Sequence, residues 1–161
     1  PIDECIRQSA AMGFDAVEPF TRRRDQCAFV LAVTSNRGSR DFQHLKVKGR
    51  PLYEHVITAA KKWNRRKNIG LVVGATRPAE LKRVRALAPE MPLLIPGIGA
   101  QKGDLKSTVR FGCDKNGELA LINVGRSIIY ASSGDDFARK AREAAVMYRD
   151  EINRYREKYF G

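Results

Sequence analysis

Four short apolar runs recur along the chain, and stretches with helical periodicity separate them. The runs are rich in β-branched residues, and none alternates polar with apolar positions. This pattern predicts strands that are buried on both faces, as in a parallel sheet. We therefore expect strands over residues 28–33, 69–73, 92–95 and 119–124.

The segments between these runs carry apolar residues three and four positions apart, which predicts amphipathic helices. Pro78 suits the first turn of one of them, and Ser133 is spaced from Asp136 as in a capping box at the start of the last. The expected helices are 52–63, 78–87, 104–111 and a final helix from near Ser133 through Ile152. Strands and helices alternate, so residues 1–161 should form a single α/β domain with a parallel sheet. An earlier strand is hinted at residues 13–17.

The composition narrows the class of protein. No apolar run approaches the roughly 20 residues of a membrane helix, and Asp3, Glu4 and Arg7 stand where a signal peptide needs an apolar segment. Three cysteines without a CxxC pair predict neither a disulfide framework nor a zinc site. We therefore expect no membrane contact, no metal and a reducing, cytoplasmic setting.

The charge is strongly basic, with 30 Lys and Arg against 18 Asp and Glu and a net charge of +12. A nucleic-acid partner therefore has to be considered. The basic clusters fall in or beside predicted helices, and none is interleaved with the aromatic residues of a stacking platform. We interpret them as solvated helix faces and expect no nucleic-acid partner.

Two neighbouring strands are predicted to end in glycine and a polar side chain. One ends in Gly97 and Gly99 with Gln101 following, and the other ends in Gly125 and Arg126. Bare backbone N–H groups, an amide and a guanidinium at one edge of a sheet suit a phosphate dianion. In an eight-stranded α/β barrel, the loops after the last two strands are where phosphate commonly binds.

These strand ends closely resemble those of the orotidine 5′-phosphate decarboxylases, in particular the longer bacterial subfamily. The matching segments, in the family's order, are VLAVTSNRGS at 30–39, GLVVGAT at 70–76, LIPGIGAQ at 94–101 and NVGRSIIYAS at 123–132. The resemblance runs from about Gly13 to the C-terminus. It implies a TIM (β/α)8 barrel, here incomplete, with these runs as strands five to eight and residues 14–17 as the stub of the fourth.

The resemblance also implies an activity and a set of site residues. The family consists of cofactor-free homodimeric lyases that decarboxylate orotidine 5′-phosphate to uridine 5′-phosphate (UMP), with the site at the subunit interface. Ser35 would hydrogen-bond the pyrimidine, while Pro96, Gly97 and Ile98 would line the base pocket. Gln101 would reach the pyrimidine and the phosphate, and the Gly125 N–H with the Arg126 guanidinium would hold the phosphate.

The chain departs from the family at the reacting groups. The family uses an Asp-x-Lys-x-x-Asp array after the third strand, whose lysine protonates the carbanion and whose second aspartate serves the neighbouring subunit. The nearest string, at 104–109, lacks the last aspartate and falls at a helix start, so the catalytic residues stay unassigned. We expect further barrel segments that are not in this sequence, before Pro1 or within the first 20 residues, and near Val17 and Glu18.

Two alternatives stay open at this point. Another phosphate-binding barrel enzyme, such as a sugar-phosphate lyase or isomerase, could have the same phosphate grip. A basic nucleotide- or nucleic-acid-binding module without chemistry would also fit the charge.

Overall fold

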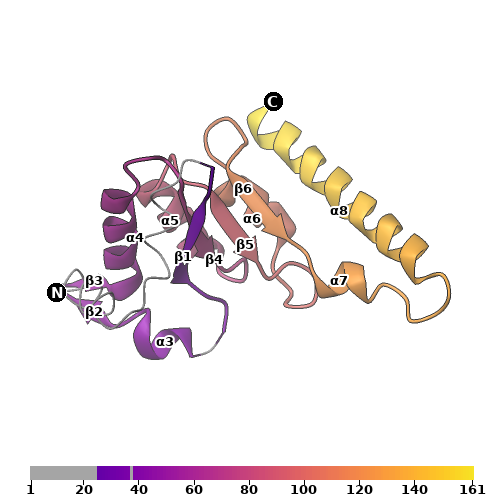
Figure 1. The fold of residues 1–161 in the computed structure, drawn as a ribbon, viewed down its shortest axis with the longest axis horizontal. Helices are drawn as coiled ribbons and strands as arrows, with labels where there is room; N and C mark the ends of the chain where they lie inside the picture. The colour runs from indigo at the N-terminus through magenta and orange to yellow at the C-terminus, as the bar shows by residue number, and fades with distance from the viewer. Residues whose placement is uncertain (1–24, 37) are drawn as a thin grey trace.

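The computed structural model describes residues 25–36 and 38–161, and its main element is a four-stranded parallel sheet (Figure 1). The strands pair in the order β1-β4-β5-β6, which is also their order along the chain. Their bounds are β1 Ala28–Val33, β4 Ile69–Val73, β5 Leu93–Pro96 and β6 Ala120–Asn123. This sequential parallel pairing is how the wall of an α/β barrel is built, which agrees with the predicted fold class.

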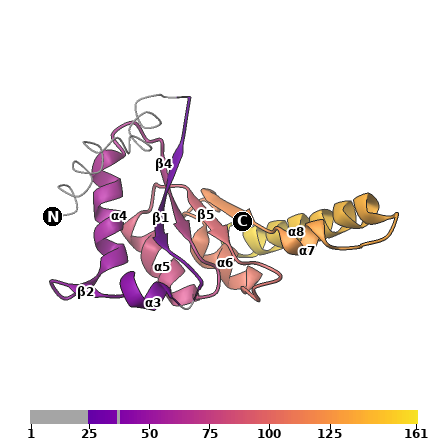
Figure 2. The same ribbon diagram turned by 60° about the horizontal axis from the view of Figure 1, so that its bottom comes forward.

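Helices cover one face of this sheet. Their bounds are α4 Leu52–Trp63, α5 Pro78–Leu87, α6 Leu105–Gly112 and α8 Phe137–Phe160. Against α4, α5 and α6 the sheet buries one set of alternating side chains completely: Ile69, Leu71, Leu93 and Ile95. The long α8 packs on α6 and extends past the β6 side of the sheet in both views (Figures 1 and 2). No described helix, α8 included, combines the length and apolar content that a bilayer crossing needs.

The other face of the sheet carries a row of apolar residues paired across all four strands: Leu31, Val72, Leu94 and Leu121. Leu31 is 54% exposed and Leu121 is 51% exposed. The prediction that every strand is buried on both faces is therefore wrong for β1 and β6, the two outer strands. In a closed barrel this face forms the packed interior. The apolar pattern of a strand shows that a face is suited to burial, but it does not show which element covers that face.

Several small elements were not predicted from the sequence. The segment after β1 holds α3 Ser39–Phe42 and the two-stranded hairpin of β2 Lys46–Val47 with β3 Arg50–Pro51. The single-turn helix α7 Arg126–Ile129 follows β6. Elements this short have too few residues to show a period. The expected strand at 13–17, and the expected missing segments before Pro1, within the first 20 residues and near Val17 and Glu18, lie outside the described residues.

The start of α8 differs from its prediction. The helix begins at Phe137, and Asp136 occupies the N-cap position. The hydroxyl of Ser132, not of Ser133, donates to the Asp136 carboxylate at 2.6 Å and accepts from Gly134 N–H at 3.1 Å. Ser132 therefore organises the turn before the helix, and the apparent capping box at Ser133 is wrong.

Arg85 is a buried guanidinium that connects the amino-terminal ends of β5 and β6. It donates six hydrogen bonds to five main-chain carbonyl oxygens, those of Ala88, Pro89, Met91, Gly112 and Leu119. Two of these carbonyls, Ala88 and Gly112, lie at the C-terminal ends of α5 and α6, where the helix dipole favours a cation. Burial lowers the pKa of this arginine. The prediction that the basic clusters are solvated is wrong for this residue.

Replacing Arg85 with methionine should destabilise the intact protein by about 2–4 kcal/mol, because buried carbonyls then lose their donors while the packing volume is kept. Urea unfolding measures the loss. Arg142→Met, at an exposed position without a described partner, is the control and should stay within about 0.5 kcal/mol of the wild type. A loss below 1 kcal/mol at Arg85 would contradict the structural role.

Glu54 and Arg83 join α4 to α5 through a two-pronged ion pair. Arg83 Nε donates to Glu54 Oε1 at 2.8 Å, and Nη2 donates to Oε2 at 3.1 Å. The Glu54 side chain is only 6% exposed, whereas Arg83 is half exposed. The hydrogen bonds from Arg83 lower the pKa of Glu54 below its usual value of 4.5, since they stabilise the ionised form.

This lowered pKa gives the stability a specific pH dependence. A carboxyl group whose pKa is depressed on folding stabilises the protein above the pKa of the unfolded chain, and that contribution is lost as pH falls through the folded value. Between pH 7 and pH 3, the wild type should lose more unfolding free energy than Glu54→Gln. Urea unfolding across this range tests it, and identical pH profiles for the two proteins would count against the pair.

Candidate functional site

The carboxyl ends of the four parallel strands meet at one edge of the sheet, and every sequence-predicted site residue lies at this edge. Ser35 follows β1 after one intervening residue, and Gly97 directly follows β5. Gly125 and Arg126 follow β6, whose last residue Asn123 pairs with Pro96 of β5. The two strand ends predicted to share an anion are therefore neighbours and point the same way.

Ser35 lies deep at this edge because Gly74, at the end of β4, leaves room for it. A Cβ on Gly74 would collide with Ser35 Oγ and lie 2.7 Å from Ser35 N. The hydroxyl oxygen of Ser35 is buried and has no hydrogen-bond partner among the described residues. A buried polar atom without a partner costs free energy that a ligand can recover. This makes Ser35 the strongest single indication of a binding site.

Gln101 approaches the same place from the loop after β5. A Cβ on Gly97 would lie 3.0 Å from Gln101 Oε1 and 3.4 Å from Ser35 Oγ. The amide of Gln101 and the hydroxyl of Ser35 therefore flank Gly97 from two different loops. The Gln101 residue is exposed, and its side chain has no partner within the described part of the chain. The two groups can reach one ligand together.

Arg126 and Gly125, at the end of the neighbouring strand β6, carry donors that no residue in the described part of the chain engages. The exposed guanidinium of Arg126 forms no ion pair or hydrogen bond with any described residue. The Gly125 N–H has no acceptor among residues 25–36 and 38–161, and nothing lies within 4 Å of the place its Cβ would take. A guanidinium next to a free backbone N–H is a favourable arrangement for a phosphate group.

Ile98 and Pro96 complete the predicted set. Ile98 is 5% exposed and belongs to the hydrophobic core, while Pro96 is half-buried. The loop that follows them is closed by two backbone hydrogen bonds, Gly103 N to Gly97 O at 3.0 Å and Lys102 N to Gly99 O at 2.8 Å. Core packing on one side and these bonds on the other hold the loop that carries Gln101.

The polar segment after β1 contributes anchors that the sequence analysis missed. Gln43 Oε1 accepts from Thr34 N–H at 2.9 Å and from Thr34 Oγ1 at 3.2 Å, which fixes the backbone next to Ser35. The guanidinium of Arg77 lies 2.9 Å from Glu80 Oε1 and 3.0 Å from His44 Nε2, and so connects the segment to the start of α5. Neither residue belongs to a local motif that could have signalled these contacts.

Asp104 caps a helix. Its carboxylate accepts from the N–H groups of Lys106 and Ser107, both at 3.1 Å, at the start of α6. A hydrogen bond from the Ser107 side chain is the main cause that lowers the pKa of Asp104. The string at 104–109 is thus a helix start, as predicted. Among the described residues, no group of histidine, cysteine, aspartate and glutamate side chains could hold a metal ion.

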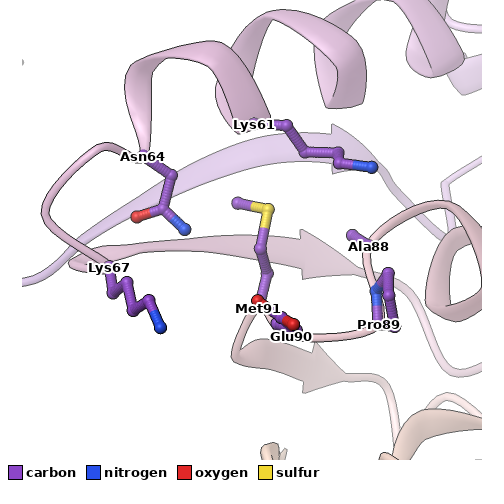
Figure 3. A pocket seen from close by; sticks show the side chains of 7 residues that line it. All are labelled: Lys61, Asn64, Lys67, Ala88, Pro89, Glu90 and Met91. Carbon is purple, nitrogen blue, oxygen red and sulfur yellow. The ribbon is translucent and has the colours of Figure 1, made fainter.

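A separate pocket of about 560 Å³ opens at the opposite end of the sheet (Figure 3). It lies beside the residues that precede β4 and β5, and it contains none of the predicted site residues. Its lining residues are Lys61, Asn64, Lys67, Ala88, Pro89, Glu90 and Met91. Lys61 is already engaged with Leu87 O at 2.8 Å. Ligands of α/β barrels bind at the carboxyl ends of the strands, so this pocket is not the candidate site.

Comparison with known proteins agrees with the geometry. The model of the orotidine 5′-phosphate decarboxylase / HUMPS family matches residues 5–141. The chain belongs to this family. Among curated relatives, the orotidine 5′-phosphate decarboxylase of Dehalococcoides mccartyi strain BAV1 is 52% identical over 158 residues, covering 96% of this chain. The Janthinobacterium enzyme of the same name is 53% identical over 153 residues, or 94% of this chain.

Solved structures give the same family. The orotidine 5′-monophosphate (OMP) decarboxylase of Leishmania donovani superimposes with a TM-score of 0.74 at 44% identity, covering 91% of this chain and 54% of that one. The chain spans 58% of the length of the Dehalococcoides relative and 56% of the Janthinobacterium one. These likenesses confirm both the family resemblance and the barrel class predicted from the sequence.

Proposed function

We propose that this chain provides the nucleotide-binding half of a lyase that decarboxylates orotidine 5′-phosphate to UMP. The observation that carries the proposal is the buried hydroxyl of Ser35, which faces Gln101 and, like Arg126 on the adjacent strand end, has no partner among the described residues. These groups match the two ends of a pyrimidine nucleotide. Membership of the decarboxylase family supports the same reaction.

Each residue has a role that its chemistry permits. The Ser35 hydroxyl can both donate and accept, so it can bind neighbouring pyrimidine groups of opposite polarity. Gln101 spans the base and the phosphate, while Arg126 and the Gly125 N–H hold the dianion. Pro96, Gly97 and Ile98 form the wall next to the base. The reaction proposed for the family requires no cofactor.

The phosphate grip contributes to the rate although it lies far from the bond that breaks. Binding energy gained at a remote group can offset the distortion and desolvation of the reacting carbon. The described residues therefore bind and orient the substrate. The lysine and aspartates that complete the reaction have no counterpart in this sequence, since the Asp-x-Lys-x-x-Asp array does not occur in it.

We further propose a homodimer with the site near the subunit interface, and a cytoplasmic location. Support for the dimer comes from exposed apolar side chains in the segment after β1, on the same edge as the site: Phe42 is 70% exposed and Leu45 is 53% exposed. Two cysteines, Cys27 and Cys113, are free thiols, which fits a reducing compartment.

Arg126→Ala should lower kcat/KM for orotidine 5′-phosphate by a factor of about 10²–10⁴, because it removes a charged hydrogen-bonding partner of the phosphate. The loss of orotate absorbance over time measures decarboxylation by the intact protein. Arg66→Ala removes an exposed arginine between α4 and β4, at the opposite end of the sheet, and serves as the control. An effect below threefold would remove Arg126 from the site.

Ser35→Ala should reduce the preference for UMP over CMP, since the hydroxyl is the group that distinguishes the base edges. Calorimetric titration with both nucleotides measures this preference. A sugar-phosphate enzyme would be indifferent to the substitution. A nucleic-acid module would instead bind long polynucleotides more tightly than UMP, with a steep salt dependence.

A further inference from the structure

Gly99 lies where the loop that carries Gln101 meets the turn that carries Arg126. The helix α8 packs against the same position. A Cβ on Gly99 would collide with Ser127 Oγ, would lie 2.9 Å from Ser127 Cβ and would lie 3.0 Å from Tyr148 Oη. Ser127 directly follows Arg126 in α7, and Tyr148 belongs to α8. Three elements that are distant in sequence therefore converge on one position that has no space for a side chain.

The loop around Gly99 is held together as a unit. Its residue Gly99 has φ +78°, a conformation that side chains disfavour. The bonds from Lys102 N to Gly99 O and from Gly103 N to Gly97 O close the loop on itself. Gln101 sits within this closed segment. A displacement at Gly99 would therefore move Gln101 relative to Arg126.

We propose that Gly99, packed against Ser127 and Tyr148, is a positioning residue that sets the spacing between Gln101 and Arg126 for the phosphate dianion. The inference rests on the proposed function, and it extends that function to the C-terminal helix. Donors that hold a charged group must lie within about half an ångström of their productive positions. A methyl group at position 99 would lie 2.9 Å from Ser127 Cβ, and no rotation of the serine side chain relieves that contact, so the loop has to move away from α7.

Gly117 provides a matched control within the same protein. It also has a left-handed backbone, with φ +75°, and it also packs against α8, since its Cβ would lie 3.1 Å from Phe160 Cβ. Gly117 lies between α6 and β6, at the end of the sheet away from the candidate site. An alanine there introduces the same backbone strain and disturbs the same helix, but it leaves the strand ends untouched.

The test compares the binding of UMP and of uridine to the intact protein by titration calorimetry, with thermal unfolding measured in parallel. Gly99→Ala should weaken UMP binding by about tenfold or more and uridine binding by a clearly smaller factor, since the phosphate depends on the spacing between Gln101 and Arg126, whereas Ser35 and the wall next to the base keep their contacts with the pyrimidine. Gly117→Ala should lower the melting temperature by a similar amount and bind UMP as the wild type does.

A rescue variant separates positioning from general damage. Adding Ser127→Gly and Tyr148→Phe to Gly99→Ala removes the three atoms that the new methyl meets, and UMP affinity should return to within about threefold of the wild type. If Gly99→Ala does not fold, Tyr148→Phe alone is the test. This variant keeps the ring and removes the hydroxyl oxygen that packs next to Gly99, and it should weaken UMP binding by about threefold and uridine binding by less.

Several outcomes would overturn the inference. One is an unchanged UMP affinity in Gly99→Ala, or in Tyr148→Phe if Gly99→Ala does not fold. Another is an equal loss of UMP affinity in Gly117→Ala. The third is a rescue variant that binds UMP no better than Gly99→Ala does. If the wild type binds UMP no more tightly than uridine, the proposed function falls together with this inference. If the wild type discriminates and Gly99→Ala discriminates equally, only the positioning role is lost.

Discussion

Close approach between loops is the constraint on which the candidate site depends. The loops after β1, β4 and β5 can meet only where the chain has no side chain, at Gly74 and Gly97. Parallel pairing of the strands brings the loops to one edge, but pairing alone would leave Ser35 and Gln101 separated by the width of β4. The glycines remove that separation. The shape of the candidate site therefore depends first on the backbone and only then on the polar side chains.

An element could be predicted from the sequence where its own residues carry a clear hydrophobic pattern. β1, β4, α4 and α5 have the predicted bounds. The two strands are uninterrupted apolar runs, and the two helices repeat apolar residues three and four positions apart. The common edge of the strand ends that carry Gln101 and Arg126 also followed from the sequence, since strands that alternate with helices are parallel and end on the same side. For Ser35, the family resemblance implied a contact with the base, and the structure adds that its hydroxyl is buried without a partner among the described residues.

What the sequence did not show depends on contacts between distant segments. Arg85 lies four positions after Leu81, on the face of α5 that is buried, but the local sequence does not show that carbonyls at Gly112 and Leu119 accept from its guanidinium. The packing of Tyr148 against Gly99 joins residues almost fifty positions apart. On the face of β6 that carries Leu121, the sequence pattern is the same whether or not another element covers that face. In each case the deciding neighbour lies elsewhere along the chain, where periodicity has no information.

The arrangement around Arg85 has a consequence for how the protein can diverge. All five acceptors belong to the main chain, so the side chains at those positions can drift while the carbonyls remain in place. The arginine has no such freedom, because a lysine has one nitrogen with three donors and cannot reach five oxygens. Among related sequences, we therefore expect the arginine to be invariant and the residues that supply its acceptors to vary. This position lies at the end of the sheet away from the candidate site.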